Sequence, residues 1–232
     1  MNYTTRILAS ILLIAVYAAG QDTDKLPPSI RTNGEATVTA TPDRSLIDIG
    51  VTTMADTSQA AATQNAQKLE TTLARLRQTL GANADIKTIN YSLSPNYRYP
   101  REGGEPSITG YTATNIVRVT IEDLTLVGKA IDAATQAGAN RIQSLRFTLK
   151  DDRSIQAQAL REAATNARRK ADALAAAMNV NIVRVLSVVE SGPVAFAVQE
   201  VAFARAADTA STPVLPGNIE VRATVTLTVE VR

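Results

Sequence analysis

The chain has 232 residues, of which 45% are hydrophobic and 20% are charged; this is enough apolar material for a core and excludes disorder along the whole chain. It contains no histidine and no cysteine, which excludes disulfides, zinc fingers and any Cys or His catalytic centre. The formal net charge of +2 gives only a weak electrostatic field, so we expect no nucleic-acid partner.

The N-terminus has the layout of a secretory signal peptide. Arg6 precedes an apolar run from Ile7 to Ala19, and Ala18 and Gly20 supply small residues at the −3 and −1 positions of a cleavage site. The alternative is a membrane anchor, but the run covers only about 20 Å, less than the ~30 Å core of a bilayer. We predict a signal peptide over 1–20, a linker over 21–29 and one folded domain over 30–232.

The mature chain opens with two alternating stretches, 35–40 and 46–51, around a short Pro-Asp turn, and this pattern predicts a β-hairpin. A long helix is expected next, over 58–80, because apolar residues recur every three or four positions. A residue of 56–58 can cap its start, and Gly81 ends it. The stripe expected to face a sheet is Ala62, Ala66, Leu69, Leu73, Leu76 and Leu80.

A second hairpin is predicted over 85–122, with arms 86–99 and 108–121 around a loop over 100–106. Its second arm should place Tyr111, Ala113, Val117, Val119 and Ile121 on one face. The hairpin contains all the tyrosines of the mature chain, which are Tyr91, Tyr97, Tyr99 and Tyr111. Two interpretations are open for them: they pack on the sheet, or they form an exposed aromatic surface that suits a partner.

The second half alternates helices and strands. We expect a helix over 124–137, a strand over 145–150, a helix over 151–178 and strands over 182–189 and 219–231. The stripe of the last helix should be Leu160, Ala164, Ala167, Ala171, Leu174 and Met178. An apolar connection over 192–217, with Phe196 and Phe203, is unusual for a solvent-exposed loop. We expect it to be covered by the domain itself, by another subunit or by lipid.

The resulting order of elements is β-β-α-β-β-α-β-α-β-β. Strands that come in hairpins, with helices inserted singly, predict an α+β fold. The helices have one apolar stripe each and the strands alternate, so three helices should pack on one face of an antiparallel sheet in two layers.

No stretch of the chain carries a recognisable catalytic, cofactor-binding or metal-binding motif. The adjacent carboxylates Asp151 and Asp152 precede a predicted helix, where capping explains them better than a metal site does. The basic run 168–170 fans over about 200° of a helix, so it predicts a solvated surface rather than one phosphate-binding face. Within it, Arg168 can pair with Asp172.

Several segments together resemble one protein family. They are SIRTNGEATVTATPDRSLIDIGV from Ser29, SLSPNYRY from Ser92, GYTATNIVRV from Gly110, DLTLVGKAIDAATQAGANRIQSLRFTL from Asp123, NARRKADALAAAM from Asn166 and PGNIEVRATVTLTVEV from Pro216. In this order they resemble the SIMPL-domain family, and 30–232 is then a SIMPL-like domain. Asn179 stands where that family's helix usually ends in glycine, and Asn tolerates the left-handed conformation that such a cap requires.

The resemblance implies a cellular location and an oligomeric assembly, but it implies no particular reaction. Bacterial members are exported proteins of the periplasm or the outer membrane. Some are immunogenic antigens, some are linked to oxidative stress, and at least one forms a large ring-like oligomer. No catalytic residue is established for the family.

Three hypotheses follow. The first is a non-enzymatic envelope protein that needs no cofactor and self-assembles into a homo-oligomer, either free in the periplasm or associated with the outer membrane. The second is a periplasmic binding module for a small molecule, peptide or glycan, with tyrosines lining a groove. The third is an enzyme that uses Ser, Lys, Asp or Glu, which no motif supports. The candidate oligomer or ligand contacts are Tyr91, Tyr97, Tyr99, Tyr111, Phe196 and Phe203.

Overall fold

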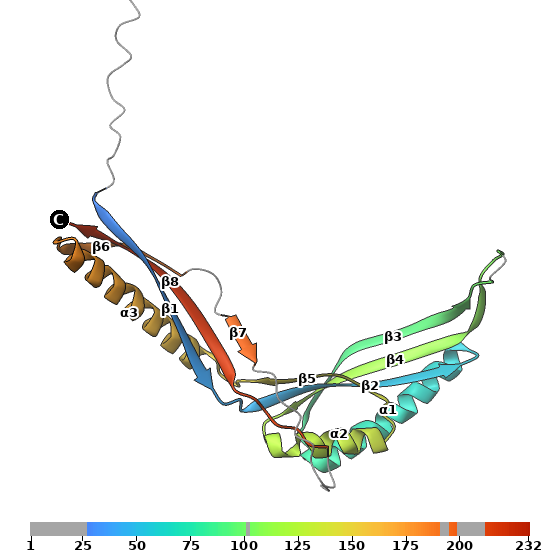
Figure 1. Cartoon of the computed structure of the whole chain (residues 1–232). Helices are drawn as coiled ribbons and strands as arrows, with labels where there is room; N and C mark the ends of the chain where they lie inside the picture. The colour runs from blue at the N-terminus through green and yellow to red at the C-terminus, as the bar shows by residue number, and fades with distance from the viewer. Residues whose placement is uncertain (1–26, 101–102, 191–194, 199–211) are drawn as a thin grey trace, which may run out of the picture.

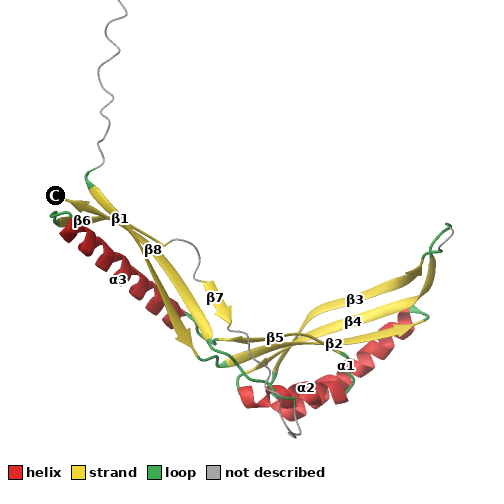
Figure 2. Cartoon of the chain, in the orientation of Figure 1, coloured by secondary structure: helices red, strands yellow, loops and turns green. Residues whose placement is uncertain are grey.

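The strands of the chain divide into two separate antiparallel sheets, each covered by helix on one face (Figures 1 and 2). This arrangement is seen in a computed structural model that describes residues 27–100, 103–190, 195–198 and 212–232. The predicted signal peptide and most of the predicted linker lie outside the described residues. We call the two halves the first lobe and the second lobe.

The first lobe is built from the two ends of the described chain. Its strands are β1 (Ser29–Ala40), β8 (Ile219–Val231), β6 (Ile182–Glu190) and β7 (Ala195–Val198). They run in the order β1-β8-β6, and β7 also pairs with β8. The helix α3 (Arg153–Ala177) lies against β1 and β8. Alternate residues of β8 are buried beneath it, as the period-two pattern of this strand predicts.

The second lobe is built from the middle of the chain. Its strands run in the order β3 (Asp85–Arg98), β4 (Ser107–Ile121), β2 (Arg44–Ala55) and β5 (Arg141–Thr148). Its helical elements are α1 (Ser58–Leu80), the short η1 (Leu124–Leu126) and α2 (Val127–Gln136). The core under the helices contains Ile47, Ile49, Val51, Val117, Val119 and Ile121. The predicted inward face of the second hairpin is therefore correct.

The predicted α+β class, with antiparallel strands and three helices, is confirmed. The predicted hairpin of 35–40 with 46–51, and with it the single sheet, is wrong. β1 pairs with β8, whereas β2 pairs with β4 and β5. The turn between β1 and β2 crosses from one lobe to the other, and Asp43 ties it to the end of β5: its carboxylate accepts the Lys150 N–H at 2.7 Å and its own N–H donates to the Thr148 carbonyl.

The capping signals in the sequence act at the ends of α1 and at the start of α3, although Asp152, the residue directly before α3, makes no capping hydrogen bond through its side chain. Thr57 caps α1 by accepting the Ala60 N–H, and Gly81 follows its last turn with φ of +99°. Asn179, just after α3, has φ of +53°, so it adopts the left-handed conformation expected in place of glycine. Asp151 accepts both the backbone N–H and the guanidinium of Arg153 at the start of α3, and Arg168 pairs with Asp172 as predicted.

The buried face of α3 differs from the predicted stripe. Alanines at intervals of four face the sheet: Ala159, Ala163, Ala167, Ala171 and Ala175. Leu174 and Met178, predicted inside, are exposed. The physical reason is the close approach of the helix to β1, where a Cβ added to Gly34 would lie 2.0 Å from the Ala163 carbonyl oxygen. Only alanine fits between backbones at that spacing.

α1 shows a smaller rotation of its predicted face. Its buried residues are Ala61, Asn65, Thr72 and Leu76, while Leu69, Leu73 and Leu80 are partly buried against the core. Ala62 and Ala66, predicted to face the sheet, line the flank of the helix instead. This flank borders the site described next.

Candidate functional site

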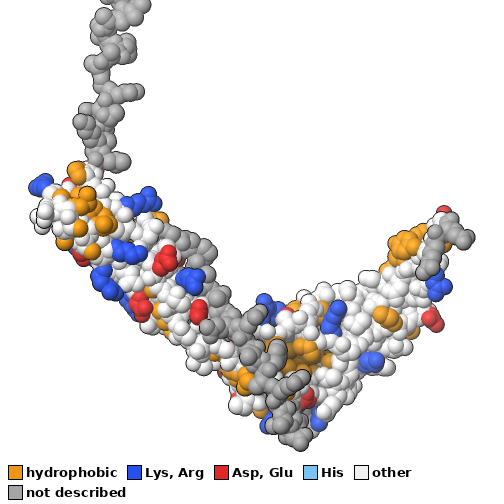
Figure 3. Space-filling view, viewed as in Figure 1, with side chains coloured by type: hydrophobic (Ala, Val, Ile, Leu, Met, Phe, Trp, Pro, Cys, Tyr) orange, Lys and Arg blue, Asp and Glu red, His pale blue; other side chains and the backbone are white. Residues whose placement is uncertain are grey.

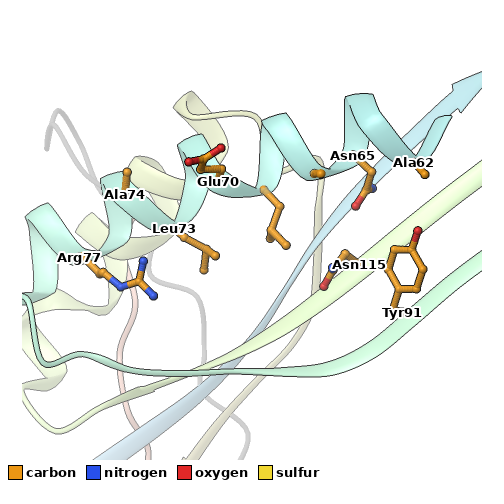
Figure 4. A pocket seen from close by; sticks show the side chains of 10 residues that line it. Ala62, Asn65, Glu70, Leu73, Ala74, Arg77, Tyr91 and Asn115 are labelled. Atoms are coloured by element: carbon orange, nitrogen blue, oxygen red, sulfur yellow. The ribbon is translucent and has the colours of Figure 1, made fainter. Parts of the chain in front are cut away.

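A groove runs along α1, between this helix and the strands β3 and β4 (Figure 4). Its volume is about 410 Å³, within the range of small-ligand sites. The lining residues come from one flank of the helix and from one position on each strand. They are Ala62, Asn65, Ala66, Leu69, Glu70, Leu73, Ala74, Arg77, Tyr91 and Asn115.

The groove exists because α1 does not cover the whole sheet. The helix packs mainly over β2 and β4, and β3 lies beyond them at the edge of the sheet. Tyr91 stands directly opposite Asn115 in the β3–β4 register, so both side chains are on the helix side. Tyr91 is nevertheless 53% exposed, which shows how little of β3 the helix protects.

Two asparagine side chains form the polar part of the groove. The Asn65 amide nitrogen donates to the carbonyls of Val51 at 2.8 Å and Ala113 at 3.1 Å, which fixes the orientation of a residue that is 1% exposed. Its Oδ1 atom is buried and has no hydrogen-bond partner among the described residues, and the same holds for Oδ1 of Asn115. A buried acceptor without a donor costs about 1–3 kcal/mol, so these two atoms mark where a ligand donor would be stabilised.

Two charged side chains also line the groove: Glu70 follows Leu69 near its middle, and Arg77 lies at the end far from Asn65. Glu70 and Arg77 are two helical turns apart on α1, which places their backbones about 10 Å from each other. Leu69 and Leu73 lie on α1 between Asn65 and Arg77 and provide the apolar part of the wall. The groove therefore combines acceptors at one end, an apolar stretch and a guanidinium at the other.

The remaining predicted tyrosines lie toward the tip of the β3–β4 hairpin. Tyr97 and Tyr99 are 51% and 71% exposed, with ring centroids 6.4 Å apart. Ile108, opposite Tyr97 in the register, is also exposed, and Figure 3 shows hydrophobic side chains gathered at this tip. Tyr111 is half-buried opposite Ala55. The tip and the groove are therefore distinct surfaces on one hairpin.

Of the two predicted phenylalanine contacts, the structure describes only Phe196. Phe196 lies in β7, on the first lobe, where it stands opposite Val221 of β8. Phe203 and most of the apolar connection lie outside the described residues. The structure thus brings Tyr91 to the groove and Tyr97 and Tyr99 to the tip, and it places Phe196 on the other lobe.

A second apolar surface, which sequence reasoning missed, is the edge strand β6. Its exposed hydrophobic residues are Val183, Val185, Leu186, Val188 and Val189. Val185 and Val188 stand opposite Val229 and Leu227, both buried on the face that α3 covers, but α3 does not reach as far as β6. The sequence showed only that this segment forms a strand, since the position of its neighbours is a tertiary property.

A polar cluster on the other face of the second lobe was also missed. Arg118 of β4 donates to both carboxylate oxygens of Asp48 at 2.7 and 2.9 Å, and the Ser144 hydroxyl of β5 donates to Asp48 at 2.8 Å. The Arg118 guanidinium lowers the pKa of Asp48 below its ordinary value; burial opposes this effect and Ser144 reinforces it. Because β2 lies between β4 and β5, this cluster joins three strands. The signal in the sequence was an acidic residue inside an apolar strand.

Among the described residues, no three Asp or Glu side chains come together as a metal-binding group. None of the described helices is both long enough and apolar enough to cross a bilayer.

Comparison with known proteins assigns the family. The model of the SIMPL family, described as a protein of unknown function (DUF541), matches residues 30–229. The chain is 27% identical over 192 residues to the 26 kDa periplasmic immunogenic protein of Brucella melitensis, covering 82% of this chain and 77% of that protein. It is 28% identical over 172 residues to the uncharacterized protein YggE of Escherichia coli K12, covering 73% and 69%. With its family model matched across both lobes, this chain belongs to the SIMPL family.

Proposed function

We propose that this protein is an exported, non-enzymatic component of the periplasm that assembles with copies of itself through unpaired strand edges. The layout of residues 1–20 and the periplasmic relative support the location. The absence of histidine and cysteine from the sequence supports a role without catalysis. A link to envelope or oxidative stress stays a prediction from the family resemblance alone.

The observation that carries this proposal is the character of two sheet edges. β3 has no charged residue from Thr88 to Tyr97, and β6 has none between Arg184 and Glu190, where Ser187 is the one polar residue among five. Both are edge strands with exposed hydrophobic side chains. Edges of this kind are templates for pairing with another chain, because the main-chain groups that face outward lack partners.

The edge strand β1 has a different character. Lys170 and Asn166 of α3 donate to the β1 carbonyls of Asn33 and Glu35, at 2.7 and 2.8 Å. Side chains thus occupy main-chain acceptors on β1. The contrast favours β3 and β6 as the contact strands between copies.

The two edges belong to different lobes, so a contact from β3 of one copy to β6 of the next is heterologous. Such contacts produce a closed ring when the rotation closes and a filament when it does not. We propose a β3-to-β6 contact repeated around a closed assembly.

The test is the mass of the mature protein, residues 21–232, by light scattering at tens of micromolar. One variant carries Val188→Lys and Val189→Lys on β6, and a second carries Ile89→Lys and Leu93→Lys on β3. We expect several subunits for the wild type and one for each variant. An equimolar mixture of the two variants should give a dimer, since each retains the edge that the other has lost.

The matched control carries Gln64→Lys and Gln67→Lys, two exposed positions of α1 away from both edges. It should assemble like the wild type. A wild type with the mass of one chain contradicts self-assembly. A single edge variant that still forms dimers on its own contradicts the head-to-tail contact.

Association with the outer membrane is a separate proposal, which the tyrosine tip supports. Exposed Tyr97, Tyr99 and Ile108 next to Arg98 have the amphipathic character of residues that lie at a membrane surface. We expect the protein to float with vesicles of phosphatidylethanolamine and phosphatidylglycerol, and Tyr97→Ser with Tyr99→Ser to abolish flotation. Tyr91→Ser is the control. Equal flotation of all three proteins contradicts the proposal.

A second candidate function is ligand binding, because the α1 groove contains Tyr91 and two buried acceptors without donors.

A further inference from the structure

We propose that the α1 groove binds a short apolar peptide in extended form, with its free C-terminal carboxylate on Arg77 and its backbone N–H groups toward Asn65 and Asn115. This inference deepens the second candidate function and does not depend on self-assembly.

The two amide oxygens determine the kind of group that the ligand must bring. Oδ1 of Asn65 and Oδ1 of Asn115 are buried acceptors, and Figure 4 shows both side chains in the space between helix and strands, with the Tyr91 ring beside them. A pure alkyl chain placed there would leave both atoms without a donor and without water. A ligand with N–H donors satisfies them, and an extended peptide backbone carries such a donor at each residue other than proline.

The amide orientation of Asn65 is set by the fold itself. Its nitrogen already donates to two strand carbonyls, those of Val51 and Ala113. Rotating the amide by half a turn would direct its oxygen at these carbonyls and lose both bonds. The oxygen is thus held as an acceptor, and the site distinguishes donors from acceptors in a ligand.

The length of the groove matches a short extended chain. Asn65 and Arg77 are twelve residues apart on α1, or about 18 Å along the helix. An extended peptide advances about 3.3 Å per residue, so five or six residues cover the distance. Between the two ends, Leu69 and Leu73 offer an apolar wall, with the Glu70 carboxylate beside them, which favours peptide side chains that are apolar and not acidic.

Arg77 determines the polarity of the bound chain. It is exposed in the last turn of α1, lines the groove, and forms none of the ion pairs found among the described residues. A guanidinium binds a carboxylate through two parallel hydrogen bonds. The C-terminal carboxylate of a peptide is therefore expected at this end, with the chain running back toward Tyr91.

The experiment measures fluorescence polarisation of a labelled hexapeptide, Gly-Ala-Val-Leu-Val-Leu, with a free carboxylate, against its C-terminal amide. The protein is the mature chain, and the Val188→Lys, Val189→Lys variant is measured in parallel so that loss of assembly and loss of binding are read separately. We expect saturable binding of the acid and at least tenfold weaker binding of the amide in both proteins.

Two variants test the assigned contacts. Arg77→Gln should lower the affinity for the peptide acid to that for the peptide amide. Asn115→Leu should lower the affinity for both peptides by at least fivefold. The matched controls are Arg75→Gln, on α1 but outside the groove, and Asn90→Leu, in register with Ile116 on the opposite side of the sheet from Asn115. Both should bind like the wild type. Asn65 is not substituted, because its amide nitrogen donates hydrogen bonds to carbonyls of both β2 and β4 and its loss would disturb the fold.

Other occupants have distinct outcomes. If dodecanoate binds saturably and the hexapeptide does not, the groove is an acyl-chain site and the proposal is wrong. If a chito-oligosaccharide binds and the hexapeptide does not, the groove is a glycan site and the proposal is equally wrong. Hexapeptide binding that is unchanged in both Arg77→Gln and Asn115→Leu overturns the assignment to this groove.

Discussion

Each lobe packs a helix against a β-sheet, but side chains of different size separate the helix from the sheet in the two lobes. In the first lobe, α3 faces its sheet through alanines and lies against Gly34, with the Thr32 hydroxyl donating to the Ala167 carbonyl at 2.8 Å. In the second lobe, α1 uses leucines as well and leaves a groove along β3. A helix face of alanines thus accompanies close helix–sheet contact in the first lobe, and a face with larger side chains accompanies a groove in the second.

The largest expected effect comes from breaking the close contact of the first lobe. Gly34→Ala places a Cβ 2.0 Å from the Ala163 carbonyl oxygen and 2.3 Å from the Ala167 nitrogen, so helix and strand must separate. We expect a loss of about 3 kcal/mol or more in the free energy of unfolding, measured by urea titration with circular dichroism. Thr37→Val, at an exposed position of the same strand, is the control. Equal stability of the two variants would contradict the close packing.

An alanine-to-leucine substitution on each helix compares how much free space lies beside α3 and beside α1. Ala167→Leu inserts a large side chain against the first sheet and should cost about 2–3 kcal/mol of unfolding free energy. Ala66→Leu, on the exposed flank of α1, should change stability by less than about 0.5 kcal/mol but occupy part of the groove. Thermal and urea unfolding of both variants measure this difference. Similar losses in both would show that α1 lies as close to its sheet as α3 does.

A smaller effect is expected from the face of the second lobe that the helices do not cover. Asp48→Asn weakens a bidentate pair with Arg118 and should cost about 1–2 kcal/mol at pH 7, since Arg118 is partly solvated. The pKa of Asp48 is lowered in the folded state, so its contribution is present above about pH 4 and is lost as pH falls through that lowered pKa. Urea titrations at pH 7 and pH 3 should show a difference between wild type and variant that shrinks at pH 3. A constant difference would mean that the charge of Asp48 contributes nothing.

The smallest effect should come from the exposed ion pair of α3. Arg168 and Asp172 are both about half exposed, and such a pair contributes little because water competes for both charges. Arg168→Ala should change the free energy of unfolding by less than about 0.5 kcal/mol, measured by the same urea titration. A loss above 1 kcal/mol would assign this pair a structural role.

The elements of this fold could be predicted where their signals are local. The ends of α1 at Ser58 and Leu80 match the prediction because Thr57 and Gly81 act on their own helix. β8 matches because its alternation needs no knowledge of its partner. The β3–β4 hairpin was also predicted correctly, because its two arms are neighbours in the chain. The pairing of β1 could not be predicted, because its partner β8 comes from the other end of the chain.

The candidate site was predictable only in part. Tyr91 stood out as an aromatic residue on an alternating strand, and the structure places it in the groove. Asn65 interrupts the apolar pattern of α1 and could have been noticed as a polar residue on the buried side. Asn115 and Arg77 carry no such signal, since their role depends on how far α1 lies from β3.

The chain order of the lobes has a consequence for biogenesis. All strands and helices of the second lobe lie within one continuous stretch, residues 44–148, whereas the first lobe needs β8 between β1 and β6. Because a chain is synthesised from its N-terminus, the elements of the second lobe can form before β1 acquires its partner β8. Removal of residues 219–231 would take the partner of both β1 and β6 out of their sheet, so the first lobe depends on this one strand.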